Sequence, residues 1–242
     1  MLENRTSNGM RINKFVAQAT GMSRREADTA ITRGLLKVNG FPAQTGQEVG
    51  MTDKVELDGR ILNLKDFITV LLNKPVGYVC SRDGQGSKTI YDLLPAELHN
   101  LKPVGRLDKD SSGLLLLTND GELAHKLTHP SYQKEKIYEL EIDKPLQQKD
   151  FEEITKQGVD IGNTRSSQFQ LQAIGKMQDA KGILTPNYFL PFTFYWRATL
   201  AEGRNRQIRR TFAHLGYEVK KLHRTQFGEY RLQLKSGNWR KI

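Results

Sequence analysis

A carboxylate in a glycine-bounded loop is the first group in this sequence that could do chemistry. The run GRLDKDSSGLLLLTNDG, residues 105–121, places Asp108 shortly after Arg106 and just ahead of an apolar strand at 114–117. A loop anchored by a buried strand holds a carboxylate rigidly and partly out of water, as nucleophilic or general-base catalysis requires. The alternative is that Asp108 and Asp110 only form the turn before a core strand, and residue type alone favours that interpretation.

Arginines gather at helical spacing near the C-terminus. Arg206, Arg209 and Arg210 fall on one face of a helix predicted over 206–215, with apolar residues on the opposite side. Such a face is often only solvated surface. Three arginines beside an apolar anchor nevertheless also suit the binding of a phosphate or a carboxylate.

The positive charge of the chain is concentrated at one end. The sequence has 242 residues and a formal net charge of +10, and residues 197–242 carry 12 Lys or Arg against 3 Asp or Glu. A concentrated basic surface attracts a polyphosphate by Coulomb steering and counterion release, although it can also serve solubility alone. Cys80 is the only cysteine, which excludes an intrachain disulfide and a cysteine zinc cluster. No stretch approaches the roughly 20 apolar residues that cross a bilayer, so we expect a cytoplasmic protein without a membrane partner.

Two units are expected, at 10–58 and 67–242. In the first, apolar spacing predicts two short helices within 11–33, with a capping box at Ser23 and a hairpin turn at Asn39-Gly40. In the second, helical patterns occur at 89–94, 122–128, 150–157 and 206–215, and strand patterns at 67–72, 137–143 and 192–200. This mixture predicts an α+β fold with a mostly antiparallel mixed sheet. No pattern can be assigned over 163–191.

Four segments of the second unit resemble the motifs of the Rsu/Rlu-type ribosomal RNA pseudouridine synthases. The run at 105–121 is almost the full signature of that family. LLNKPVGYVCS (71–81), KIYEL (136–140) and AEGRNRQIRRTFAHLGYEVKKLHR (201–224) agree with its other motifs in order and spacing. Thr211 departs from the pattern, because the family usually has a methionine there. The resemblance covers nearly the whole chain except about 163–191.

The resemblance implies an active site and a reaction. Asp108, not Asp110, would be the catalytic residue, Tyr138 the active-site tyrosine, and Arg209 the basic residue whose charge keeps a buried Asp108 ionised. The reaction cuts uracil from C1′ of the ribose, rotates it and rejoins it through C5, without a cofactor or a metal. The target uridine must leave its stack to be reached. Whether Asp108 attacks C1′, attacks C6 or removes a sugar proton stays open.

The N-terminal unit resembles the S-four-type RNA-binding domain, named after a small-subunit ribosomal protein, across RINKFVAQATGMSRREADTAITRGLLKVNG. The expected partner is therefore ribosomal RNA, with the large-subunit RNA favoured, and a monomer is expected to bind it. Basic side chains would position the RNA through its phosphates without reading sequence. These side chains are Arg24, Arg25, Arg33, Arg106, Arg206, Arg210, Lys220, Lys221 and Arg224.

Two other classes of protein compete with an enzyme. A non-catalytic RNA-binding ribosome assembly factor would keep the fold without the reaction, but it has no need of Asp108, Tyr138 and Arg209 together. A DNA-binding regulator would need a recognition helix with base-reading side chains, and none stands out. A metal site is not expected, because His125 and His129 lack an adjacent glutamate and a third ligand.

Overall fold

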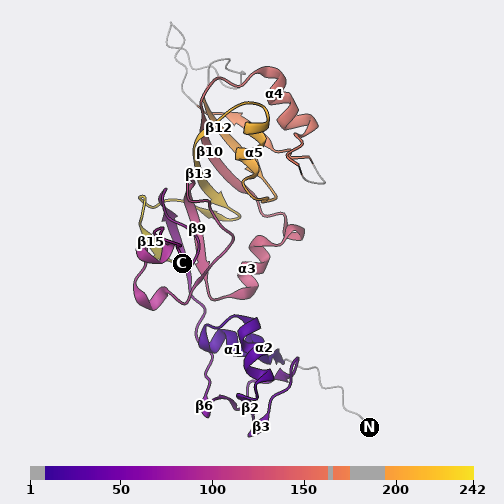
Figure 1. Ribbon diagram of the computed structural model, residues 1–242, viewed down its shortest axis with the longest axis vertical. Helices are drawn as coiled ribbons and strands as arrows, with labels where there is room; N and C mark the ends of the chain where they lie inside the picture. The colour runs from indigo at the N-terminus through magenta and orange to yellow at the C-terminus, as the bar shows by residue number, and fades with distance from the viewer. Residues whose placement is uncertain (1–8, 163–165, 175–193) are drawn as a thin grey trace. The chain divides into compact units, whose positions relative to one another are not determined.

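The chain divides into two units, each described here by itself. The computed structural model describes residues 9–162, 166–174 and 194–242, and contacts between Cα atoms separate Met1–Ile68 from Thr69–Ile242 (Figure 1). Most of the stretch 163–191 therefore lies outside the described residues. Within the described ranges, no helix is long and apolar enough to cross a membrane.

The first unit packs two short helices against small strands. Its elements are β1 (Met10–Arg11), α1 (Ile12–Thr20), α2 (Arg24–Thr32), β2 (Leu36–Val38), β3 (Phe41–Pro42), β4 (Glu48–Val49), β5 (Val55–Leu57) and β6 (Arg60–Ile61). Strands pair in the order β3-β2-β5-β6, and β1 pairs with β4. The apolar faces of the helices, with Phe15 and Ile31, close a core over Leu36 and Val55.

The second unit is built on a mixed sheet. Its strands are β7 (Thr69–Lys74), β8 (Lys102–Pro103), β9 (Ser112–Thr118), β10 (Lys136–Ile142), β11 (Gln170–Ala173), β12 (Tyr195–Leu200), β13 (Val219–Phe227), β14 (Tyr230–Arg231) and β15 (Trp239–Lys241). They pair in the order β11-β12-β10-β13-β9-β7-β15, with β8 beside β9 and β14 beside β13. The contact of β9 with β13 is parallel, and the other pairings of the described strands are antiparallel.

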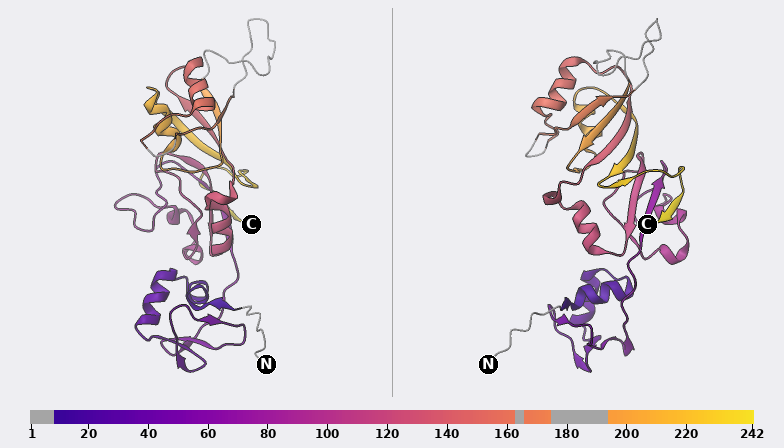
Figure 2. Two further views of the ribbon diagram at one scale, coloured as in Figure 1. Left: turned by 90° about the vertical axis from the view of Figure 1, so that its right-hand side faces the viewer. Right: turned by 180° about the vertical axis from the view of Figure 1, so that it is seen from behind.

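Helices cover this sheet in two places. The α-helices are α3 (Gly121–Thr128), α4 (Gln148–Glu152) and α5 (Gln207–His214); η1 (Ile90–Leu93), η2 (Ala96–Leu98) and η3 (Pro130–Tyr132) are 3-10 turns, and η4 (Glu153–Gln157) is a π-helical turn. Phe212 of α5 packs with Trp196 and Leu222 of the sheet, whereas Leu127 of α3 packs with Phe227. Figures 1 and 2 show α4 and α5 near β10 and β12, and α3 near β9. Strand β13 contributes to both apolar clusters. The mixed sheet with separate helices confirms the predicted α+β class.

The parallel contact between β9 and β13 requires a glycine. Gly113 has a φ of +110°, and a Cβ on it would lie 2.3 Å from the carbonyl oxygen of Arg224 and 2.5 Å from its nitrogen. Any larger residue would push the two strands apart. Gly113 therefore fixes the distance between the strand that follows Asp108 and the strand that carries Arg224.

Candidate active site

The loop that carries Asp108 is held by Lys74, the last residue of β7. Lys74 is fully buried, and its Nζ donates hydrogen bonds to the carbonyl oxygens of Pro75 (3.0 Å), Asp108 (3.0 Å) and Ser111 (2.7 Å). Burial lowers the pKa of Lys74, and the negative charges of Asp108 and Asp110 oppose that shift. The three carbonyl oxygens compensate the ammonium group for lost water. Lys74 therefore anchors the backbone of the loop at both ends of its turn.

Two further contacts fix the same loop. The Cys80 thiol donates to the carbonyl oxygen of Leu107 at 3.3 Å and accepts from the Leu107 N–H at 3.4 Å. The Gly77 N–H donates to the carbonyl oxygen of Lys109 at 2.7 Å. Burial raises the pKa of Cys80, so the group stays a neutral thiol that can donate. Because these contacts all involve loop backbone, they position Asp108 and leave its carboxylate available.

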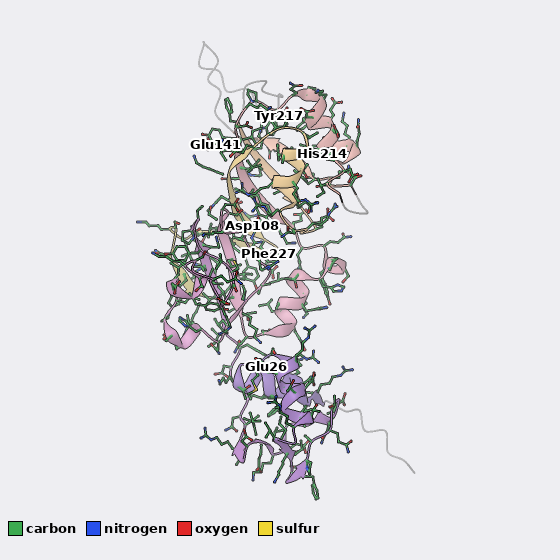
Figure 3. All side chains as sticks on the ribbon, in the orientation of Figure 1. Glu26, Asp108, Glu141, His214, Tyr217 and Phe227 are labelled. Carbon is green, nitrogen blue, oxygen red and sulfur yellow. The ribbon has the colours of Figure 1, made fainter. Side chains whose placement is uncertain are left out.

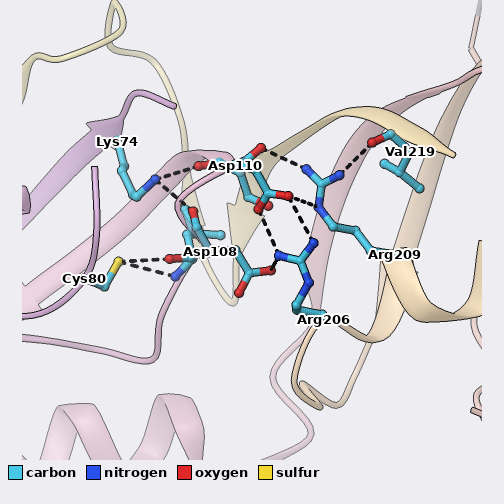
Figure 4. A network of polar contacts seen from close by, with 9 residues as sticks. Lys74, Cys80, Asp108, Asp110, Arg206, Arg209 and Val219 are labelled. Carbon is cyan, nitrogen blue, oxygen red and sulfur yellow. Dashed lines mark hydrogen bonds and ion pairs between the residues drawn. The ribbon is translucent and has the colours of Figure 1, made fainter. Parts of the chain in front are cut away.

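Two aspartates of this loop have different surroundings (Figure 4). Asp110 accepts from both terminal nitrogens of Arg206, at 3.0 and 3.1 Å, and pairs with Nε of Arg209 at 3.2 Å. Partial burial raises the pKa of Asp110, but the hydrogen bond from Arg206 and the charges of both arginines outweigh it, so that pKa lies below its usual value. Asp108 has one ion pair among the described residues, Oδ2 to Nη1 of Arg206 at 3.4 Å, and its side chain is 31% exposed. Asp110, although its side chain is 47% exposed, is thus held by both arginines, while Asp108 makes a single and longer ion pair.

The expected partner of Asp108 is corrected by this geometry. Arg209 was predicted to pair with Asp108, but its guanidinium donates to the carbonyl oxygens of Val219 at 2.6 Å and Asp110 at 2.8 Å, besides pairing with the Asp110 carboxylate. Helix α5 begins at Gln207, and Arg206 precedes it with a positive φ of 49°, so Arg206 leaves the helical face and reaches Asp108. Asp108 is also half-buried, not buried as expected.

Asp108 opens into a cleft. The cleft has a volume of about 310 Å³, a size suited to a small ligand such as a nucleobase with its sugar. Figure 3 shows Asp108 within the second unit, and the cleft has Tyr138 of β10 and Arg206 in its lining too. The remaining lining is mixed: Gly105, Arg106, Leu107, Ser111, Leu200, Glu202, Gly203, Arg204, Asn205, Gln207, Ile208 and Leu222. A carboxylate, a phenol and an apolar floor can together hold a planar ring and attack it or its sugar.

The comparisons with known proteins agree with one another. The family described as RNA pseudouridylate synthase matches residues 68–214. The chain is 35% identical over 237 residues to the dual-specificity RNA pseudouridine synthase RluF of Escherichia coli (strain K12), which covers 96% of this chain and 75% of that protein. It is 34% identical to the ribosomal large subunit pseudouridine synthase B of Bacillus subtilis (strain 168), covering 96% and 91%. The chain belongs to the RNA pseudouridylate synthase family. A crystal structure of a pseudouridylate synthase is similar to it throughout, with a TM-score of 0.65 and 29% identity over 96% of both chains.

As an RNA pseudouridine synthase, the protein needs basic side chains that can reach phosphates. The predicted ones differ in their exposure and in the contacts that they already make. Arg106 is exposed at the edge of the cleft. Arg210 donates to the carbonyl oxygen of Ile161. Lys220 and Lys221 are exposed but pair with Glu218 at 2.6 Å and Glu141 at 2.7 Å, pairs that water screens and RNA can displace. In the first unit, Arg24, Arg25 and Arg33 are all exposed, and Arg24 donates to Oδ1 of Asn13 at 3.1 Å.

Arg224 is the predicted phosphate ligand that the structure contradicts. Its side chain is only 2% exposed, so it cannot contact a phosphate on the surface of the synthase. On β13 it lies two residues after Leu222, so both side chains are on the inward side of the strand, and this spacing was visible in the sequence. Sequence reasoning also missed the anchoring role of Lys74, which depends on carbonyl groups far along the chain. Among the described residues, no cluster of three His, Cys, Asp or Glu could hold a metal ion.

Proposed function

We propose that this synthase isomerises a specific uridine of ribosomal RNA, with Asp108 as its catalytic residue. The observation that carries the proposal is that two aspartates of one loop are paired differently. Asp110 engages both arginines, whereas Asp108 lines the cleft with a single ion pair at 3.4 Å. A nucleophile or base needs an oxygen that faces the substrate cleft and is not held in close ion pairs, and Asp108 is the one of the two that meets both conditions.

Tyr138 and Arg209 complete the proposed active site. Tyr138 lines the cleft with Asp108 and offers a ring that can pack against a flipped uracil. In this proposal its hydroxyl assists removal of the C5 proton at the end of the reaction. Arg209 acts indirectly. It contacts the carboxylate and the carbonyl oxygen of Asp110 and so fixes the loop beside Asp108. The reaction requires no cofactor.

The proposed substrate is ribosomal RNA, with the large-subunit RNA favoured. This rests on the resemblance in the motifs and on the printed name of the Bacillus subtilis relative, a ribosomal large subunit synthase. Pseudouridine should be mapped in RNA from cells with and without the gene. Loss of one site in large-subunit RNA, restored by wild type but not by Asp108→Asn, is expected. Loss confined to another RNA would overturn the substrate, and restoration by Asp108→Asn would overturn the catalytic residue.

The first unit is proposed to be an RNA-binding domain of the S-four type. Exposed Arg24, Arg25 and Arg33 on or beside α2 support this, since the capped helix carries them away from its apolar face. Changing the three arginines to glutamine should weaken RNA binding and reduce its salt dependence, because each phosphate contact adds about one to the slope. An unchanged salt slope would count against the domain as a contributor to binding.

A further inference from the structure

Arg224 lies between the two strands that carry the active site. It is on β13, which pairs with β10 on one side and β9 on the other; its register partners are Tyr138 and Gly113. Its Nε donates to the carbonyl oxygen of Leu114 at 2.8 Å, and its Nη1 lies 3.5 Å from the Tyr138 hydroxyl. One guanidinium therefore contacts both the strand that follows the Asp108 loop and the active-site tyrosine.

The charge of Arg224 is buried without a carboxylate partner among the described residues. Its guanidinium lies 4.9 Å from the ring centre of Phe227 and 6.0 Å from that of Tyr138, and its Nη2 is buried without a hydrogen-bond partner. Burying a cation in this way is strongly unfavourable, and a well-packed apolar residue would usually serve stability better. Its charge also reaches Lys136, whose pKa is lowered by burial and, secondarily, by Arg224. A costly cation beside a reactive group indicates a role in the reaction.

We propose that Arg224 is a positioning residue for the isomerisation, which holds the Tyr138 hydroxyl at a fixed distance from the Asp108 loop. The proposal rests on the function proposed above for Tyr138. Two rigid features support it. Gly113 brings β9 and β13 close together, and the bond to the Leu114 carbonyl oxygen ties the guanidinium to β9. A side chain fixed at that end can restrain the phenol of Tyr138, which lines the cleft.

The step that depends on this restraint is the last one. When the C5–H bond of the rejoined uracil breaks, its electron pair restores the C5–C6 double bond. The proton passes to the phenol oxygen as the phenol's own proton passes to solvent in the open cleft. Cleavage of the bond to C1′ depends on Asp108 instead. Loss of Arg224 should therefore slow proton removal selectively.

The test compares Arg224→Met with Arg224→Lys under single-turnover conditions, using ribosomal RNA that carries uridine or C5-deuterated uridine. Because a positioned proton-transfer group contributes about 10²- to 10⁴-fold, we expect Arg224→Met to be slower by roughly tenfold or more. Its RNA affinity should stay unchanged, and its deuterium isotope effect should exceed that of wild type. Arg224→Lys keeps the charge but lacks the planar fork, so it should fall between them. Arg197→Met is the matched control, since Arg197 on β12 is partly buried with 41% of its side chain exposed, and among the described residues it forms an ion pair with Glu139 at 3.1 Å.

A double-mutant cycle separates positioning from mere stability. In a Tyr138→Phe background, Arg224→Met should cause almost no further loss of rate, because the hydroxyl that Arg224 restrains is gone. A fully additive loss, or a slower rate with a wild-type isotope effect, would show that Arg224 only supports the fold. If Arg224→Met does not fold, Arg224→Lys gives the same two readouts. Wild type that forms no pseudouridine in ribosomal RNA would instead overturn the proposed substrate and leave Arg224 to be tested on the true one.

Discussion

Replacing Lys74 by methionine removes the anchor of the Asp108 loop while keeping the length of the side chain. Three carbonyl oxygens then lose this donor, although that of Asp108 still accepts from the Ser111 N–H at 3.1 Å. That of Ser111 belongs to a residue 1% exposed, whereas Pro75 and Asp108 are partly exposed and can recruit water. A buried acceptor left without a donor costs about 1–3 kcal/mol, and an ordinary hydrogen bond contributes about 1 kcal/mol. The sum is about 4 kcal/mol. Relief from burying the ammonium group offsets part of it, which leaves a net loss of about 2 kcal/mol.

This loss has a thermal and a kinetic consequence. About 2 kcal/mol corresponds to a fall in melting temperature of roughly 4–8 °C for a unit of this size. The contacts of Cys80 and Gly77 remain, so the loop should shift but not unfold. A displacement of about 1 Å at a reacting group can cost about a hundredfold in rate. We therefore expect Lys74→Met to bind RNA normally and to release tritium from C5-labelled uridine about tenfold to a hundredfold more slowly.

Calorimetry and single-turnover tritium release measure the two effects. Lys149→Met is the control, because Lys149 is exposed on α4 and its loss should change the free energy of unfolding by less than about 0.5 kcal/mol. If Lys74→Met matched Lys149→Met in both melting temperature and rate, the three carbonyl contacts would not position Asp108. A lower melting temperature with an unchanged rate would limit Lys74 to a role in stability.

Three further outcomes are expected. The pKa of Asp110 is below its usual value, so its contribution to the free energy of unfolding is complete above about pH 3.9 and is lost as the pH falls through the folded-state pKa. Asp110→Asn should therefore flatten the acid limb of a curve of stability against pH. An unchanged acid limb would contradict the ion pairs. Arg209→Ala should impair single-turnover activity severely. Arg209→Lys should impair it less, because lysine keeps the charge, but not restore it fully, because lysine cannot contact Val219 and Asp110 together. Equal rates for Arg209→Ala and wild type would reduce Arg209 to a surface contact. Activity should survive exhaustive treatment with EDTA, and a loss restored by a divalent ion would reveal a metal requirement.

Local patterns predicted much of the fold because they are decided by neighbours in sequence. The Ser23 side chain accepts from the Glu26 N–H at 3.2 Å and Glu26 accepts from the Ser23 N–H at 2.6 Å, as the capping box requires. Asn39 and Gly40 both have positive φ, 53° and 85°, which suits the predicted two-residue hairpin. The helix expected at 150–157 is instead α4 followed by a π-helical turn, and the one at 89–94 is a short 3-10 turn. Such choices depend on packing, which apolar spacing does not encode.

The sequence predicted the residues of the candidate site that belong to recognisable motifs. It predicted less well the contacts between residues that are far apart in the chain. Asp108 and Tyr138 line one cleft, but the arrangement of Arg206 and Arg209 could not be derived from helical spacing. It depends on the positive φ of Arg206, because of which the helix begins one residue later than predicted. Arg224 was misplaced because a basic stretch resembles a surface, although its position two residues after the buried Leu222 indicated an inward position.

The neighbouring aspartates show why one carboxylate of the pair can be reactive. Two acids on a short loop would repel each other if both faced the same space. Arg206 and Arg209 resolve this by neutralising Asp110 with three contacts of 3.0 to 3.2 Å, which also pins α5 to the loop. Arg206 then lies at 3.4 Å from Asp108, a longer contact than the two it makes with Asp110. Asp110 thus serves as the counterion of Arg206 and Arg209 and leaves the Asp108 carboxylate with one longer contact, and Asp110→Asn should therefore slow the reaction without replacing Asp108 as the proposed catalytic group.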